Sequence, residues 1–136
     1  MKKLLSVFCL FTVGLFFISN SYAFDIALLF SNHTNITVKT EGTVNLENSA
    51  GMSWAEPTKP TMVWVSPKTD NVPQDQPHKN LVSYDLNYFD VINEQGKLKA
   101  VCMSNYLGLS KTAVIKFDLF QDQNNRFYCK RTITYA

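Results

Sequence analysis

The chain has 136 residues, of which 46% are hydrophobic, with 13 basic and 11 acidic residues. This length and composition fit one globular domain with one core, and they exclude a disordered or low-complexity chain. A formal net charge of +2 without a basic cluster makes nucleic acid an unsuitable partner, because phosphate neutralisation dominates that kind of affinity. We therefore expect no nucleic-acid partner.

Residues 1–23 have the three-part pattern of a secretory signal peptide. Two lysines precede the apolar residues 4–18, and small polar residues lead from there to Ala23. The apolar run is shorter than the roughly 20 residues that cross a bilayer, so we expect cleavage after Ala23 and not a membrane anchor. The remaining domain, residues 24–136, would be formally neutral, secreted or periplasmic, and without an integral membrane segment.

Alternating apolar and polar side chains predict β-strands throughout this domain, and no segment has a helical period. Turns rich in Gly, Asn and Asp separate the strands. We expect about seven to eight strands: residues 24–31, a tight hairpin over 36–46 with its turn at Glu41 and Gly42, and residues 61–66, 81–93, 98–104, 112–120 and 127–135. Residues 47–60 and the proline-rich residues 67–80 are expected to be exposed loops, because proline cannot donate a ladder hydrogen bond.

Three cysteines occur, and Cys9 would leave with the signal peptide. The remaining pair, Cys102 and Cys129, is expected to form a disulfide in an exported protein. Their strands are separated by a third, and the outer strands of a three-stranded meander lie about 9–10 Å apart. Disulfide Cα atoms lie within about 7 Å. We therefore expect an all-β fold that is a single antiparallel β-sandwich with Greek-key, immunoglobulin-like topology, in which the cysteines' strands face or pair with each other.

Catalytic and metal-binding patterns are weak. His33 and His78 lie in turn-like surroundings without a nucleophile motif, and two distant histidines are too few for a zinc site. Asp70, Asn71 and Asp75 could ligate calcium, but they fit solvated loop residues better. We expect no catalytic residue, no metal and no cofactor.

Aromatic side chains are the most suggestive binding feature, because they offer rigid contact area at low entropic cost. Trp54 lies in the first long loop, whereas Trp64 is expected to be buried. Tyr84 and Tyr88 are expected to share one strand face. The candidate binding residues are Trp54, Tyr84, Tyr88 and His78.

The sequence therefore favours a small exported non-catalytic protein that binds a protein, glycan or cell-surface partner through the loops 47–60 and 67–80. One alternative is a small hydrolase with an Asp/Glu pair, since such a pair is defined in space and not in sequence. Another is a membrane-active, pore-forming-like protein, which the neutral charge disfavours. Residues 117–122 are similar to late strands of lytic proteins of the aegerolysin type, but this resemblance carries no functional residue. The oligomeric state stays open.

Overall fold

The computed structural model describes residues 23–48, 61–103 and 105–136. The expected signal peptide and Trp54 therefore lie outside the described residues. The described chain forms nine strands, listed here in chain order: β1 Phe24–Asn32, β2 Val38–Asn48, β3 Thr61–Val65, β4 Thr69–Pro73, β5 His78–Ile92, β6 Leu98–Val101, β7 Leu107–Leu109, β8 Ala113–Gln121 and β9 Phe127–Tyr135. The expected all-β class is confirmed.

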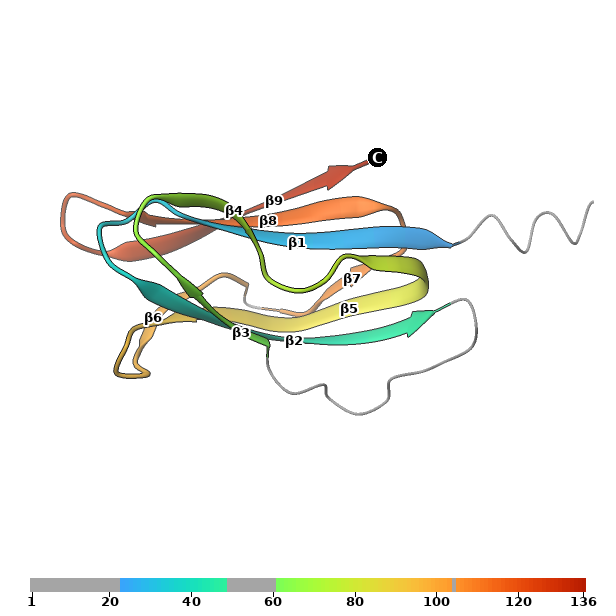
Figure 1. The fold of residues 1–136 in the computed structure, drawn as a ribbon, viewed down its shortest axis with the longest axis horizontal. Coiled ribbons are helices and arrows are strands. Elements are labelled where there is room, and N and C mark those ends of the chain that lie inside the picture. The colour runs from blue at the N-terminus through green and yellow to red at the C-terminus, as the bar shows by residue number, and fades with distance from the viewer. Residues whose placement is uncertain (1–22, 49–60, 104) are drawn as a thin grey trace, which may run out of the picture.

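All nine strands belong to one hydrogen-bonded sheet of order β3-β2-β5-β1-β8-β9, with β4 paired to β1, and β6 and β7 paired to β5. Figure 1 shows that this sheet is folded into two facing layers. The first layer contains β1, β4, β8 and β9, and the second contains β2, β3, β5, β6 and β7. The long strand β5 joins them, because its first residues pair with β1 and the rest pairs with β2.

The expectation of a purely antiparallel sheet is wrong. β1 runs parallel to β8, in a continuous register from Ile26 opposite Ala113 to Asn32 opposite Leu119. Alternation of side chains shows which residues face the core, but it does not show the direction of a neighbouring strand. The sheet is consequently mixed, and two short strands, β4 and β7, raise the number above the expected seven to eight.

The predicted hairpin over residues 36–46 is also wrong, because β2 is one continuous strand. Gly42 lies inside this strand, paired with Phe89 on one side. A Cβ atom at Gly42 would lie 3.0 Å from the Tyr88 carbonyl oxygen and 3.1 Å from Cδ2 of Phe89. The glycine is therefore explained by close packing and not by a turn.

The proline-rich residues 67–80 are only partly a loop. β4 pairs with β1 in this segment, and β5 already begins at His78. Gln74 between them is 3% exposed; its amide donates to the Val72 carbonyl, and its side-chain oxygen accepts from the Thr40 hydroxyl. The Gln74 backbone amide also donates to the Leu28 carbonyl of β1 at 3.0 Å. The bonds to Thr40 and Leu28 attach the segment to both layers, which corrects the expectation of an exposed connection.

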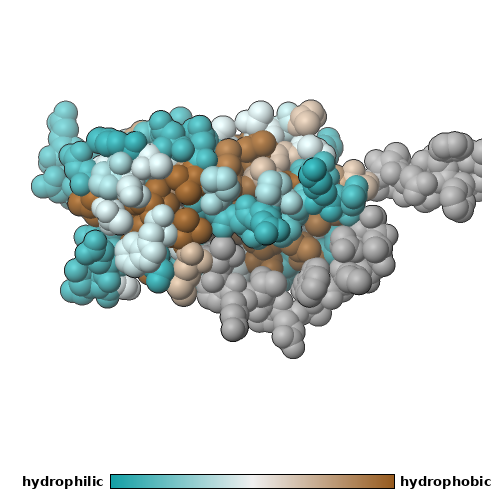
Figure 2. Space-filling model, in the orientation of Figure 1, coloured by the Kyte–Doolittle hydropathy of each residue, from teal (hydrophilic) through white to brown (hydrophobic). Residues whose placement is uncertain are grey.

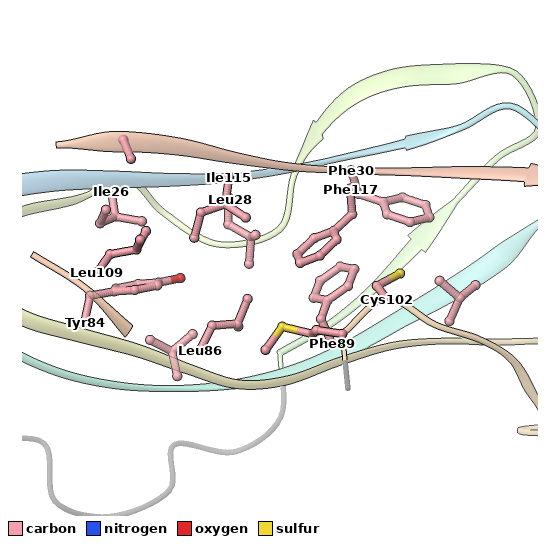
Figure 3. Packing of buried hydrophobic residues seen from close by; sticks show 14 of the residues in the cluster. Ile26, Leu28, Phe30, Tyr84, Leu86, Phe89, Cys102, Leu109, Ile115 and Phe117 are labelled. Atoms are coloured by element: carbon pink, nitrogen blue, oxygen red, sulfur yellow. The ribbon is translucent and has the colours of Figure 1, made fainter. Parts of the chain in front are cut away.

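The core fills the space between the layers, as Figure 3 shows. The ring of Phe89 from the second layer stacks on that of Phe117 from the first, with centroids 4.4 Å apart, and it also approaches Phe30 at 5.9 Å. In Figure 2 apolar side chains appear along the margin where the layers meet, between polar side chains above and below. The two layers are thus held together mainly by buried aromatic and aliphatic surface.

A β-bulge divides β5 into two halves. Tyr84 and Leu86 point inward before the bulge, and Phe89 and Val91 point inward after it. Tyr88 pairs with Thr43, but Leu86 pairs with the next residue, Val44, so Asn87 is an extra residue in β5. Such a bulge reverses which side chains point inward. Tyr84 is consequently 1% exposed in the core, whereas Tyr88 points outward and Phe89 inward at 2% exposure. The expectation that Tyr84 and Tyr88 share a face is therefore wrong.

The structure contains the expected disulfide between Cys102 and Cys129, with Cα atoms 4.9 Å apart. Cys102 directly follows β6 in the second layer, and Cys129 lies in β9 of the first layer. The bond thus crosses between layers, which is one of the two arrangements that the strand-spacing argument allowed, and it is compatible with an oxidising, exported location.

Candidate binding surface

Three of the predicted binding residues, Tyr84, Tyr88 and His78, belong to the described residues, and the structure does not bring these three together on one surface. Tyr84 is buried, and burial raises its pKa, with a smaller contribution from the nearby Asp75 carboxylate. His78 lies 6.4 Å from the Tyr84 ring, measured between centroids, and only Tyr88 points outward from the second layer. Trp64, expected in the core, is 53% exposed because it lies on the outward side of the edge strand β3.

A different surface emerges from the register of β3, β2, β5 and β6. Directly paired residues point to the same side of a sheet. Met62, Glu41, Asp90 and Val101 form one such row across all four strands. The neighbouring row is Trp64, Lys39, Ile92 and Leu98, and Tyr88 lies beside Asp90 along β5. We call these nine residues the outer face.

The margins of the outer face are apolar. Nine large hydrophobic residues of the described chain are exposed, and four of them belong to this face: Met62, Trp64, Leu98 and Val101, at 50–58% exposure. The Lys39 ammonium lies 5.3 Å from the centroid of the Trp64 ring, in cation–π geometry. Met62 and Trp64 thus form one apolar margin on β3, and Leu98 and Val101 form another on β6. Exposed apolar patches bordered by polar groups are typical of interaction surfaces.

The centre of the outer face is acidic. Glu41 and Asp90 stand directly opposite each other on neighbouring strands. The Tyr88 hydroxyl donates to Glu41 Oε1 at 3.3 Å. Burial raises the pKa of Asp90, and the neighbouring Glu41 carboxylate raises it further. Burial and the Glu41 carboxylate likewise raise the pKa of Tyr88.

Both histidines are engaged by carboxylates outside this face. His33 Nε2 lies 2.7 Å from Asp118 Oδ1, and its Nδ1 lies 3.8 Å from Asp70. His78 Nε2 lies 2.7 Å from Asp75 Oδ2. A general base needs a ring nitrogen directed at a nucleophile. In His33 both nitrogens are directed at carboxylates, which supports a structural role.

Three further observations bear on the choice of site. An open hollow of about 250 Å³ with apolar walls lies beside Ala27, Pro77, Val114 and Tyr135, and neither Tyr84, Tyr88 nor His78 lines it. In the described ranges, no group of three or more His, Cys, Asp or Glu residues is arranged to hold a metal ion. The described residues also contain no helix with the length and hydrophobicity needed to span a membrane.

The sequence patterns did not indicate Lys39, Glu41 and Met62 as binding residues. The expected hairpin places Glu41 in a turn because Gly42 follows it, and pairing between distant strands leaves no local signal in the sequence. The chain matches no protein-family model and no curated protein sequence. The structure itself defines the class: the described chain is an all-β protein whose two facing layers are joined by a disulfide.

Proposed function

We propose that the chain is an exported, non-catalytic binding protein whose outer face contacts a partner protein. The partner would place a lysine or arginine between Glu41 and Asp90 and apolar side chains against Trp64 and Val101. The two facing layers support the interpretation as a β-sandwich, in which each layer leaves one broad face for contacts.

One observation carries this proposal. Like charges directly opposite in a sheet are destabilising. Among the described residues, no cation forms an ion pair with Glu41 or Asp90, and the nearby Lys39 lies over the Trp64 ring. A partner cation would relieve this repulsion, and the surrounding apolar margin would exclude water from the contact.

The test immobilises the chain without residues 1–23 and exposes it to soluble and envelope fractions of the cells that produce it. The double variant Trp64→Ser with Val101→Ser should lose the retained partner protein. The matched control, Val114→Ser with Tyr128→Ser, removes two exposed apolar side chains from the opposite layer and should retain it. Equal retention by both double variants would refute the outer face as the contact surface.

A second readout distinguishes a protein partner from a glycan. Glu41→Gln with Asp90→Asn should weaken retention of the protein and reduce its dependence on salt, because charge pairing is screened by salt. Polysaccharide retained in place of protein, with unchanged affinity in this variant, would overturn the proposal of a basic protein partner.

The acid pair also supports a second candidate, a small glycoside hydrolase. Such enzymes use two carboxyl groups, one with a raised pKa as the general acid, which is the direction found for Asp90. Against it, both carboxylates stand on the outer side of a sheet layer. Polysaccharide turnover by the purified chain, abolished in both Glu41→Gln and Asp90→Asn, would favour the hydrolase.

A further inference from the structure

The free edge of β9 differs from the other edges of the sheet. In the described part of the chain, β9 pairs only with β8, through an uninterrupted register from Gln121 opposite Phe127 to Ala113 opposite Tyr135. β9 has nine residues and contains neither proline nor glycine. β3 and β4 have five residues each, and β4 includes Pro73 and a register shift. Short or irregular strands protect an edge against pairing, whereas β9 has no such protection.

The hydrogen bonds at the two ends of this ladder show which backbone groups are free. The Ala136 amide donates to the Thr112 carbonyl at 3.1 Å, and the Asp122 amide donates to the Arg126 carbonyl at 2.9 Å. Hydrogen-bonded and non-bonded pairs alternate in an antiparallel ladder. The even-numbered residues of β9 therefore bond to β8. The odd-numbered residues direct their amides and carbonyls outward: Phe127, Cys129, Arg131, Ile133 and Tyr135.

This edge is held in an extended conformation before any partner arrives. The disulfide fixes Cys129 to the second layer, and the Lys99 ammonium lies 5.2 Å from the centroid of the Phe127 ring. A strand that is already ordered lowers the entropic cost of pairing. The structure therefore offers a rigid template for an added strand.

The charge of β9 selects among incoming strands. Lys130 and Arg131 are adjacent and exposed, and β9 contains no acidic residue. Asp118 pairs with Lys130 in the register, but its Oδ1 is 2.7 Å from His33 and 3.6 Å from Lys116. Within the described ranges, neither Lys130 nor Arg131 forms an ion pair. Two basic side chains without acidic partners thus lie at the middle of an open edge.

A second copy of β9 fits this edge poorly in the register that pairs all nine residues. Antiparallel pairing of two copies with complete overlap, Phe127 opposite Tyr135, places Arg131 directly opposite Arg131. This register opposes two cations, which destabilises the pair. An incoming strand with carboxylates opposite Lys130 and Arg131 would instead bring opposite charges together, which stabilises the pairing.

We propose that β9 binds an extended acidic segment of a partner polypeptide by strand addition. The segment pairs with the outward backbone groups of Arg131 and Ile133, and its carboxylates lie against Lys130 and Arg131. This site is separate from the outer face, because it is an edge of the first layer and not a face of the second.

The test uses the chain without residues 1–23 and three synthetic nine-residue peptides. All three alternate Val and Thr, except that two adjacent central positions carry Glu, Lys or Ser, because Lys130 and Arg131 are adjacent and point to opposite faces of β9. Fluorescence anisotropy should show that the Glu peptide binds most tightly. Hydrogen exchange followed by NMR should show new protection at the amides of Cys129, Arg131 and Ile133. The amides of Lys130 and Thr132 should change little, because they already bond to β8.

Two kinds of variant distinguish the contribution of side-chain charge to peptide binding from the contribution of backbone hydrogen bonds. Arg131→Glu should weaken binding of the Glu peptide by about fivefold or more, because it reverses a charge at the contact. Lys97→Glu makes the same change in net charge at the exposed β5–β6 turn and should leave binding within about twofold, since Lys97 is not part of the β9 edge. Arg131→Pro removes an outward amide and should weaken binding further than Arg131→Ala does.

Equal binding of the three peptides, or binding without the alternating protection, would overturn the proposal even if Arg131→Pro failed to fold. Dimerisation of the chain that Arg131→Ala strengthens and Arg131→Pro abolishes would also overturn it, because the occupant of the edge would then be a second copy.

Discussion

Asp90 and Glu41 illustrate how single residues can reduce stability at a surface. Their side chains stand directly opposite on β5 and β2, and the pKa of Asp90 is raised by burial and by Glu41. The native state therefore holds a proton on Asp90 more tightly than the unfolded chain does. The free energy of unfolding falls as pH rises from the ordinary Asp value of 3.8 through the raised one.

We predict that Asp90→Asn stabilises the isolated chain at pH 7, by a few tenths of a kcal/mol up to about 1 kcal/mol, because the ionised like-charge pair is removed. The gain should shrink as pH falls below the raised pKa, where the wild-type carboxyl is protonated. Urea denaturation at a series of pH values measures this. Glu94→Gln, in the exposed β5–β6 turn, is the control without an opposing carboxylate. A lower stability of Asp90→Asn at pH 7 would contradict the electrostatic account.

At the scale of elements, the bulge in β5 decides which aromatic residues are available to a partner. One extra residue, Asn87, places Tyr88 outside and Phe89 inside. Phe89 then contacts Phe117 and Phe30 across the layers, whereas Tyr88 joins the outer face. The same bulge thus contributes both to the core and to the proposed contact surface.

We predict that Phe89→Ala lowers the free energy of unfolding by roughly 3–5 kcal/mol, because it leaves a cavity between the layers. The adjacent change Tyr88→Ala should cost less than about 1 kcal/mol, because that side chain lies on the surface. Thermal or urea denaturation of the two variants gives the comparison. A similar loss of unfolding free energy in both variants would show that the bulge does not change which β5 side chains point inward.

For the whole molecule, the disulfide is the covalent link between the layers. Cys102 belongs to the end of the second layer, and Cys129 belongs to the edge strand β9. Without it, β9 is held by the β8 ladder and by packing of half-buried residues such as Phe127 and Ile133. The bond closes a loop with a sequence separation of 27 residues, which reduces the entropy of the unfolded chain.

We predict that Cys102→Ser with Cys129→Ser lowers the free energy of unfolding by about 3–4 kcal/mol in the chain-entropy model. Urea denaturation is the measurement, and reduction of the wild-type chain by a thiol should give a similar loss. A loss below about 1 kcal/mol would show that the unfolded chain gains little freedom when the bond is removed.

Local patterns were sufficient for the fold class and for much of the strand placement. Alternation in residues 24–31 and 112–120 predicted β1 and β8, because a residue's facing within a strand depends on its immediate neighbours. The disulfide pairing also followed from sequence, and the fixed distances of strand spacing and disulfide geometry limited the two cysteines to strands that pair directly or face each other across layers.

The binding surface, in contrast, was decided by tertiary structure. The bulge at Asn87, the parallel pairing of β1 with β8 and the opposition of Glu41 and Asp90 depend on strands that are distant in the chain. The exposure of Trp64 likewise follows from the position of β3 at the edge of the sheet. The sequence by itself thus determined an all-β chain with one disulfide. Only the packing of the layers decided which side chains face a partner, because register and neighbour order are long-range properties.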